Sequence, residues 1–480
     1  MMDIFGYFRE ICRIPRESGN EEGMRRYLLS WAEENGFEGL RDEVGNIIVR
    51  TAATPGFEDV PYVALQAHMD MVCVKVPGSN HDFLKDPIEV YQDGDFLKAN
   101  GTSLGGDDGI GVAIAQAIFT DPQSKHGPLE AVFTFSEETG MNGAYGLDGN
   151  MVRSRRMINI DSEDEGTIFI GCAGGIDLVG TASYDMEPVP ADWDTLEFTV
   201  SGLKGGHSGG EIHKQHLNAI SALSRMLLSI EETGIPFRLA RFDGGTKRNV
   251  IPFCATCSIC VPEANKHDVV GKVVETFNVI REENKYEEPG FSLEKMCSHH
   301  GAKRFDTALD VDETLILVKA LFACPHGVFT MSKAIPGIVE TSDNLAIVKL
   351  IDGKLDLQVS VRSNIDSSKY YLVNRIKTIF ESFGIECRIG DGYPAWTPDP
   401  YSDLARFCAE AYEQMFGTKP VVTAIHAGLE CSVINSRCPG MDSVSIGPQM
   451  YDIHSTEERL SISSSIRTYD FVKHLLSIIK

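Results

Sequence analysis

The first 165 residues alternate short apolar runs with helical stretches, and this alternation restricts the folds open to the chain. Strand-like runs occur at residues 45–50, 62–70, 130–136 and 156–161, and a helical pattern follows Gly109. Apolar strands that alternate with helices favour a mostly parallel sheet covered by helices on both faces. In such sheets, ligands gather at the carboxyl ends of the strands. The sequence therefore predicts an α/β domain with a functional site at one edge of its sheet.

A different pattern begins near Gly175. From there to about residue 393, strand-like and helical stretches alternate as in an α+β sandwich of ferredoxin-like type, with extra material between residues 285 and 350. Two helical stretches then close the chain. We therefore expect one domain inserted into another. Residues 1–175 and 394–480 would form the first domain, and residues 176–393 the second.

The composition is ordinary for a soluble globular protein and argues against several classes of partner. Of the 480 residues, 42% are hydrophobic and 24% charged. The net charge of −25 opposes binding to nucleic acid or to an anionic membrane, because basic surface supplies that attraction. The sequence has neither an 18-residue apolar run nor the pattern of a signal peptide. Together with scattered cysteines, these features lead us to expect a cytoplasmic protein.

Three cysteines, Cys254, Cys257 and Cys260, follow one another at spacings of three. This spacing resembles an iron–sulfur run. However, the surrounding stretch has a strand pattern, and in a strand this spacing sends neighbouring side chains to opposite faces. We therefore expect these cysteines to act as small hydrophobic residues.

Polar side chains that can bind metal or transfer protons stand at the ends of the strand-like runs. Each alone has an ordinary structural explanation, such as a helix cap or a core histidine. Several carboxylates gathered at one sheet edge, however, repel one another unless cations neutralise them. Imidazole and carboxylate ligands suit zinc, and also cobalt or manganese. The side chains are His68 and Asp70, Asp107 and Asp108, Glu137 and Glu138, Asp161, and the distant His454.

The spacing within two of these pairs indicates that the two members of each pair have different roles. His68 and Asp70 point to the same face of an extended strand, so His68 can bind a metal while Asp70 orients its imidazole. Glu137 and Glu138 are adjacent and must point in different directions. One of them can therefore bind metal while the other takes a proton.

The order of these motifs resembles that of the dizinc metallopeptidases whose catalytic domain carries an inserted lid. Three further stretches are similar to those of the aminoacyl-histidine dipeptidases, also called cytosolic non-specific dipeptidases. They are "IFIGCAGG" (168–175), "GGHSGGEIH" (205–213) and "HAGLECS" (426–432). The resemblance covers nearly the whole chain. It departs at "KQHLNA", directly after "GGEIH", where smaller, glycine-bearing residues are expected.

The resemblance implies two Zn²⁺ ions per subunit, for which Co²⁺ or Mn²⁺ could substitute. Metal coordination lowers the pKa of water to about 7, so a hydroxide shared by the two ions could attack the scissile carbonyl. Asp108 would lie outside the ligand set. The resemblance assigns His68 and Asp161 to one ion, Glu138 and His454 to the other, and Asp107 to a bridging position.

The resemblance also implies roles for residues that do not bind metal. Glu137 would be the general base, with Asp70 behind His68. In the inserted domain, His207 would stabilise the oxyanion, and Asn249 and Arg362 would bind the substrate carboxylate, for which the planar guanidinium of arginine is suited. Gly428 would lie against the substrate backbone. His207 could reach the metals only by closure of the lid or from a neighbouring subunit, and a homodimer through the lid is implied.

The expected function is therefore metal-dependent hydrolysis of dipeptides with a free terminal carboxylate, including Xaa-His. A tripeptide aminopeptidase or an N-acyl amino acid deacylase on the same scaffold remains an alternative, as does a non-catalytic peptide-binding protein. The last should have lost Glu137 or a ligand, and the sequence retains them all. A calcium module does not fit His68 and His454, because calcium takes oxygen ligands.

Overall fold

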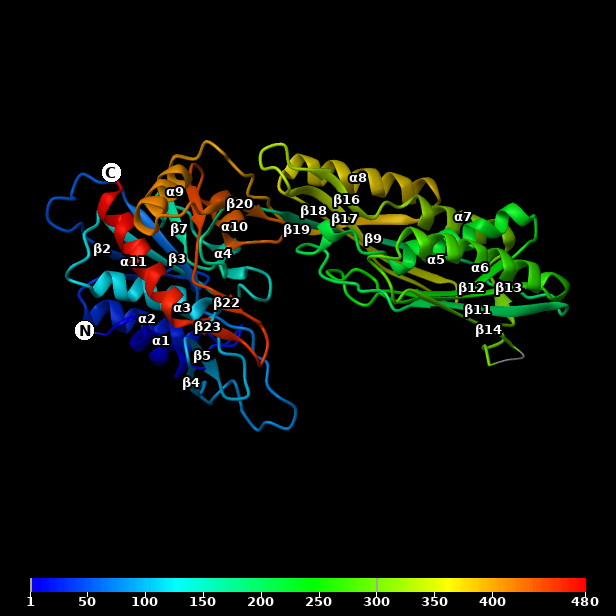
Figure 1. Ribbon diagram of the computed structural model, residues 1–480, viewed down its shortest axis with the longest axis horizontal. Helices are drawn as coiled ribbons and strands as arrows, with labels where there is room; N and C mark the ends of the chain where they lie inside the picture. The colour runs from blue at the N-terminus through cyan, green and yellow to red at the C-terminus, as the bar shows by residue number, and fades with distance from the viewer. Residues whose placement is uncertain (1, 299–300) are drawn as a thin grey trace. The chain divides into compact units, whose positions relative to one another are not determined.

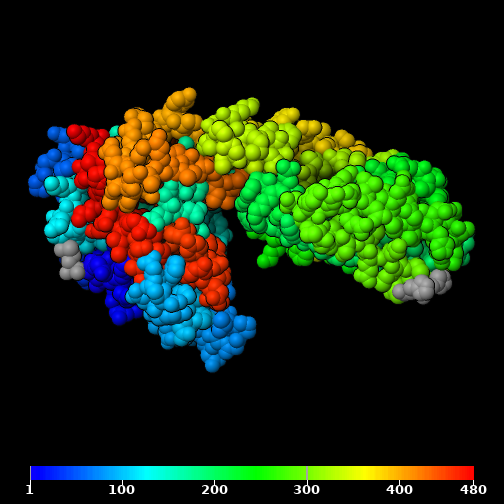
Figure 2. All heavy atoms as spheres, in the orientation of Figure 1, coloured from blue at the N-terminus to red at the C-terminus, as the bar shows by residue number. Residues whose placement is uncertain are grey.

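The computed structural model describes residues 2–298 and 301–480, and the chain divides into two compact units. Unit 1 comprises Met1–Cys172, Trp396–Ala424 and Leu429–Lys480, and unit 2 comprises Ala173–Ala395 and Ile425–Gly428. In Figure 2, the blue-to-cyan and orange-to-red parts of unit 1 pack in one body.

The sequence pattern places residues 425–428 in the first domain, whereas the structure groups them with unit 2. The backbone N–H of Ala173 donates to the carbonyl oxygens of Ile425 and Ala427, at 3.0 Å each. These two bonds tie the short returning segment to the start of unit 2. A local sequence pattern cannot reveal this pairing, because the bonded residues lie far apart in the chain.

Unit 1 is built on an eight-stranded sheet with parallel pairing at its centre. Strands β6, β3, β7 and β21 pair in parallel, whereas β1–β2, β2–β6 and β21–β8 are antiparallel. The α/β class expected from the sequence is confirmed, and the parallel part is the centre of the sheet. In spatial order the strands are β1 (Glu38–Arg41), β2 (Ile47–Thr51), β6 (Leu129–Thr134), β3 (Val63–His68), β7 (Arg156–Asn159), β21 (Asp442–Ser445), β8 (Thr167–Cys172) and β20 (Val421–Ile425).

Helices and a smaller sheet complete unit 1, and both chain termini belong to it (Figure 1). Within the residues that the structure describes, no helix combines the length and apolar character that crossing a membrane requires. The helices are α1 (Ile4–Cys12), α2 (Glu22–Glu34), α3 (Gly106–Thr120), α4 (Asn142–Gly146), α9 (Asp403–Phe416), α10 (Glu430–Arg437) and α11 (Ile462–Ile478). The four-stranded sheet has the order β22 (Met450–Tyr451), β23 (Arg459–Ser461), β5 (Phe96–Ala99) and β4 (Val90–Asp93).

The helical pattern over residues 4–34 is divided between α1 and α2, and the chain between them carries a buried arginine. The guanidinium of Arg16 is only 2% exposed and donates to the carbonyl oxygens of Met69 at 3.2 Å and Asp70 at 2.6 Å. The segment between the two helices is therefore bonded, through Arg16, to the backbone that directly follows β3. The polar side chains of the candidate site begin at this point.

In the residues that the structure describes, unit 2 contains a nine-stranded antiparallel sheet and four longer helices. In Figure 1 these helices lie along one side of the sheet, and one apolar core joins all four to it. The helices are α5 (Ala219–Ser229), α6 (Lys266–Glu283), α7 (Val311–Ala323) and α8 (Asp366–Ser382). The strands run in the order β14 (Ser292–Cys297), β11 (Trp193–Ser201), β13 (Ala255–Pro262), β12 (Arg238–Gly244), β17 (Val339–Ile351), β18 (Lys354–Ser363), β9 (Gly174–Ser183) and β19 (Glu386–Tyr393), and β16 (Gly327–Met331) pairs with β17.

The stretch expected as extra material supplies a large part of this sheet. It contributes β14, β16 and β17, and β17 joins β12 to β18. Unit 2 is thus broader than one ferredoxin-like sandwich. Its short elements are β10 (Glu187–Pro188), which pairs with β15 (Thr307–Ala308), and the 3₁₀ helices η1 (Ile212–Lys214), η2 (Ile230–Thr233) and η3 (Glu263–Asn265).

The cysteine run lies on and just before β13. Cys257 and Cys260 are buried and Cys254 is partly exposed, and all three are free thiols. Burial raises the pKa of the Cys257 thiol, which opposes the thiolate form that metal clusters require. Two of the three therefore serve as buried small side chains, as the strand pattern predicts.

Candidate active site

His68 ends β3 and lies between two acidic side chains that face the same ring nitrogen. Its Nε2 is 2.9 Å from Oδ1 of Asp107 and 3.4 Å from Oδ1 of Asp161. On the opposite side of the ring, Nδ1 is 3.4 Å from Oδ1 of Asp70. The alternation of side chains along an extended strand puts His68 and Asp70 on one face. The imidazole therefore has one nitrogen toward the acidic group and the other toward Asp70.

Asp107 links this histidine to a second one from far along the chain. It lies at the start of α3, where its φ/ψ values are not helical. Its Oδ1 faces His68, and its Oδ2 is 3.0 Å from Nε2 of His454. The same His454 nitrogen is 2.9 Å from Oε1 of Glu138. The five residues proposed as metal ligands thus form one continuous chain of contacts, with Asp107 at its centre.

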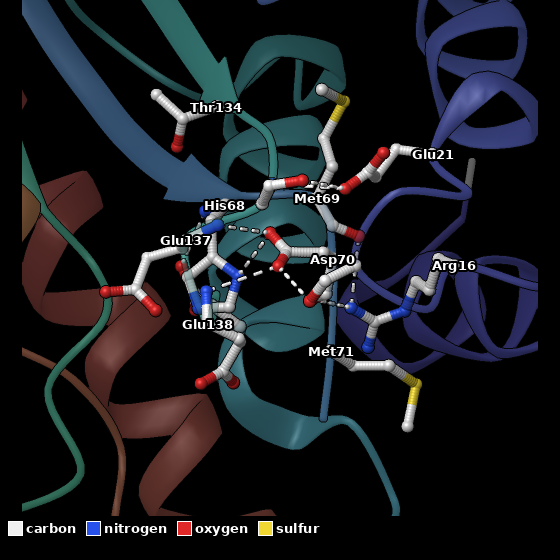
Figure 3. A network of polar contacts seen from close by, with 12 residues as sticks. Arg16, Glu21, His68, Met69, Asp70, Met71, Thr134, Glu137 and Glu138 are labelled. Carbon is white, nitrogen blue, oxygen red and sulfur yellow. Dashed lines mark hydrogen bonds and ion pairs between the residues drawn. The ribbon is translucent and has the colours of Figure 1, made fainter. Parts of the chain in front are cut away.

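The turn after β6 is held by Asp70. Its Oδ1 accepts a hydrogen bond from the backbone N–H of Glu137 at 3.0 Å, and its Oδ2 accepts one from that of Glu138 at 3.3 Å. Its Oδ2 also accepts from the hydroxyl of Ser18 at 2.7 Å. In Figure 3, the side chains of Glu137 and Glu138 leave this turn in different directions. Glu138 contacts His454, and Glu137 is left out of the ligand chain.

The acidic neighbours raise the pKa of both histidines. Burial alone would lower the pKa of His68, but the charge of Asp161 and the hydrogen bond with Asp107 raise it well above its usual value. Burial would likewise lower the pKa of His454, yet its hydrogen bonds with Asp107 and Glu138 raise it to about 11. Both imidazoles are therefore held in a setting that favours positive charge.

The pKa values of the carboxylates are shifted as well. Burial raises the pKa of Asp161 to about 6, and burial raises that of Glu137 well above its usual value. For Asp107, burial would raise the pKa, but the hydrogen bonds with both histidines outweigh this effect and lower it. The group thus carries more buried negative charge than its own side chains neutralise.

This donor set fits divalent cations. The ligand atoms of His68, Asp107 and Glu138 lie within 4.8 Å of one another. They combine imidazole nitrogen with carboxylate oxygen, the donors that zinc prefers. Cations would also supply the positive charge that the buried carboxylates demand.

A second group of candidate residues lies within unit 2. Nδ1 of His207 accepts from the backbone N–H groups of Gly209 at 3.2 Å and Gly210 at 3.0 Å. Burial, together with the charge of Arg362, lowers the pKa of His207. A neutral imidazole that accepts at Nδ1 carries its proton on Nε2. His207 is therefore arranged as a hydrogen-bond donor through Nε2.

Arg362 on β18 lies close to His207. A Cβ atom at Gly209 would stand 3.0 Å from Cε1 of His207 and 3.2 Å from Nε of Arg362, so both side chains border this glycine. The side chain of Asn249 is exposed, while its backbone carbonyl accepts from the N–H of Ser208 at 2.9 Å.

Gly428 belongs to the returning segment Ile425–Gly428 of unit 2. The structure thus brings His207 and Arg362 together. It places Asn249 in the chain that pairs with the His207 loop, through the bridge between His207 and Val250.

Comparisons with known proteins show the family of the chain. Residues 64–477, which make up most of the chain, match the model of Peptidase family M20/M25/M40. The chain belongs to this peptidase family. It is 41% identical to the cytosol non-specific dipeptidase of Escherichia coli strain K12, over 98% of this chain and 96% of that relative. The resemblance inferred from the sequence motifs is thereby confirmed.

Solved structures support the same fold. The crystal structure of aminoacylhistidine dipeptidase from Vibrio alginolyticus matches with a TM-score of 0.92 and 35% identity, covering 99% of this chain and 96% of that one. Aminopeptidase PepT from Bacillus cereus matches with a TM-score of 0.57 and 16% identity, covering 99% and 97%. The PepT match concerns the fold alone.

Two further buried acids support the acidic group of this peptidase: Glu458, which sequence reasoning missed, and Asp108, which it placed outside the ligand set. Glu458, only 3% exposed, accepts from the backbone N–H groups of the glycine-rich loop before Asp107, at 2.8, 3.2 and 2.8 Å for residues 104, 105 and 106. Asp108 accepts from the backbone N–H of His68 at 3.3 Å and of Gly111 at 3.1 Å, so it braces the backbone. Glu458 follows a polar stretch that gives no sign of burial in the sequence.

Glu430 is a further buried acid, and although it lies in the "HAGLECS" stretch, nothing in the sequence indicates its burial. Its Oε2 accepts from Nε2 of Gln66 at 2.6 Å and from the hydroxyl of Thr134 at 2.5 Å. Burial raises the pKa of Glu430 to about 7. These contacts join α10 to β3 and β6, the two strands whose ends carry His68 and the glutamate pair.

The buried His426 predicts a pH dependence of stability. Its Nε2 lies 2.8 Å from Oγ of Ser342 and its Nδ1 lies 3.2 Å from Oδ1 of Asn364. Burial, with the charge of Arg362, lowers its pKa from 6.5 to about 3. Between these values the unfolded chain binds a proton that the folded chain does not. The free energy of unfolding should therefore fall as the pH drops through this window, by up to about 1.4 kcal/mol per pH unit.

Urea unfolding at a series of pH values checks this expectation. A His426→Gln variant should lose less stability than the parent chain as the pH falls, because glutamine has no proton to gain. His267→Gln, at an exposed position on α6, is the matched control and should follow the parent. Parallel stability curves for the parent chain and His426→Gln would contradict the assignment.

Proposed function

We propose that this M20 peptidase is a metal-dependent dipeptidase that cleaves dipeptides with a free carboxyl terminus, including Xaa-His. The names of the Escherichia coli and Vibrio alginolyticus relatives support the dipeptidase assignment, and the former also supports a cytosolic location. The observation that carries the proposal is the position of Asp107, with one carboxylate oxygen 2.9 Å from His68 and the other 3.0 Å from His454.

His68 and Asp161 would hold one divalent ion, and Glu138 and His454 the other, with Asp107 shared between them. The imidazole and carboxylate donors favour Zn²⁺, with Co²⁺ or Mn²⁺ as substitutes. When bound, the ions would supply a water of lowered pKa and polarise the scissile carbonyl.

Glu137 would accept the proton of the attacking water and deliver it to the leaving amine. Two contacts support this role. The hydrogen bonds that the backbone N–H groups of both glutamates donate to the carboxylate of Asp70 fix the turn. Because Glu137 leaves that turn in another direction than Glu138, its carboxylate is free of the ligand chain (Figure 3).

Residues of unit 2 would bind the substrate. Nε2–H of His207 would donate to the developing oxyanion, and the orientation of its ring by two backbone N–H groups supports this role. Arg362 and Asn249 would bind the terminal carboxylate, and Gly428 would lie against the substrate backbone. His207 and Arg362 come from the same chain, so their pairing needs no second subunit. The homodimer implied by the resemblance is a separate proposal, which light scattering would test.

Removal of metal tests the core of this proposal. Dialysis against a chelator should abolish hydrolysis of Ala-His, and added Zn²⁺, Co²⁺ or Mn²⁺ should restore it, because the acidic group needs cations to function. The chelator-treated enzyme mixed with Mg²⁺ serves as control, since this ion prefers all-oxygen ligands. Full activity of a preparation shown to be metal-free would refute the mechanism.

A substrate panel separates the related activities. The proposal expects turnover of Ala-His and other dipeptides to exceed that of Ala-Ala-His and of N-acetyl-histidine, when each is compared by kcat/KM. Preference for the tripeptide would instead assign a tripeptide aminopeptidase, and preference for the acetylated compound a deacylase.

A further inference from the structure

Tyr393 contacts the guanidinium of Arg362 within unit 2. Nη1 of Arg362 donates to the phenolic oxygen of Tyr393 at 2.6 Å. The two residues lie on β18 and β19, which flank β9 on either side. The register pairs Gly175 of β9 with both of them. Directly paired residues place their side chains on the same face of a sheet, so Tyr393 reaches Arg362 across position 175.

The glycine at position 175 makes this crossing possible. A Cβ atom there would lie 2.6, 2.7 and 2.8 Å from Cε1, Cζ and Oη of Tyr393. These distances are too short for any side chain, so the phenol ring occupies the space that the glycine leaves. Gly175 ends the "IFIGCAGG" stretch singled out in the sequence. A glycine is therefore required at this position because the tyrosine ring fills the space of a side chain, and not because the backbone adopts an unusual conformation.

Two further features fix where Tyr393 lies. The pairing of β19 with β9 shifts between Ile389 and Gly392, which adds a residue to β19 just before the tyrosine. Such irregularities re-aim the side chains that follow them. The buried ammonium of Lys369 then donates to the carbonyl oxygen of Tyr393 at 2.6 Å and to Asp366 at 2.6 Å. The tyrosine is thus held through its backbone while its hydroxyl holds Arg362.

We infer that Tyr393 is a positioning residue for Arg362, and that Gly175 gives it the room to act. Tyr393 accepts from Nη1 of Arg362, whereas the buried Nε has no hydrogen-bond partner among the residues that the structure describes. Because Nη1 is occupied, the edge of the guanidinium that carries Nε is left for another acceptor. A carboxylate suits this edge, because its two oxygens can accept from two parallel N–H groups. Tyr393 therefore sharpens selectivity for substrates with a free carboxylate. This inference rests on the proposed role of Arg362 in carboxylate binding.

The test compares Ala-His with its carboxamide as substrates of the metal-loaded enzyme. Tyr393→Phe keeps the ring and removes the hydroxyl. It should raise KM for Ala-His by about tenfold, the usual effect of losing one hydrogen bond to a charged group, and change kcat by less than about twofold. The carboxamide should be nearly unaffected. Gly175→Ala should give the same loss of selectivity, because its methyl group displaces the ring.

Tyr370→Phe, at a half-exposed position on α8, is the matched control and should behave as the parent. A Tyr393→Phe variant that folds normally by thermal melting, yet keeps the parent's preference for the carboxylate, would overturn the inference. The double variant gives a second check. In an Arg362→Ala background, Tyr393→Phe should have no added effect, and a further tenfold loss would also overturn it.

The same set of variants separates this inference from the proposed function. If Arg362→Ala leaves the preference for Ala-His over its carboxamide intact, the proposed carboxylate-binding role is wrong. If Arg362→Ala abolishes the preference and Tyr393→Phe does not weaken it, the carboxylate role stands and only the positioning role is lost.

Discussion

A Glu137→Gln variant is expected to lose about 10²–10⁴-fold in kcat while keeping its full metal content. Glutamine has the size of glutamate but cannot accept a proton. Because the side chain of Glu137 is not part of the chain of contacts that joins the two histidines, its replacement should leave the ligands in place. Metal analysis of the purified variant and steady-state hydrolysis of Ala-His check the two halves of this expectation.

The neighbouring residue is an informative comparison. Glu138→Gln should lose metal as well as activity, since Glu138 contacts His454 at 2.9 Å. Glu58→Gln, at an exposed position, should lose neither. Near-normal turnover by Glu137→Gln would refute the assignment of the general base. A loss of metal in that variant would instead make Glu137 a ligand.

The second large effect is expected at Asp107. Asp107→Asn should lower metal content and reduce kcat/KM by more than about 100-fold, because replacing groups that merely support metal ligands already costs 10–100-fold. The asparagine keeps the shape of the side chain but removes the charge that both histidines contact at 2.9 and 3.0 Å. Metal analysis after dialysis, together with hydrolysis of Ala-His, measures the effect.

Asp108→Asn is the matched control. One oxygen of Asp108 accepts from the backbone N–H of His68 and the other from that of Gly111. The single amide oxygen of asparagine can keep one of these two bonds, and neither of them goes to a proposed metal-binding atom. This variant should retain its metal and most of its activity. If Asp108→Asn loses metal and Asp107→Asn does not, the assignment of the bridging carboxylate is reversed.

The sequence by itself determined the local structure around the site. Strands β3 and β6 are buried throughout, as their apolar runs predict, and the candidate ligands His68 and Glu138 follow from the places where those runs stop. Side chains alternate between the two faces of a strand, so Asp70 lies on the same face as His68. Glu137 and Glu138 are neighbours in the chain, so their side chains point in different directions. These features depend on neighbours within a few residues, so a single chain segment encodes them.

Only the tertiary structure decided which distant groups meet. From the sequence, Glu458 and Glu430 would be expected to be exposed to solvent, yet both are buried. Backbone N–H groups donate hydrogen bonds to Glu458, and polar side chains of other strands donate to Glu430. Likewise, Tyr393 reaches Arg362 only because β9 lies between their strands with a glycine at the crossing point. Strand order and register bring together residues far apart in the chain, and no local periodicity specifies that choice.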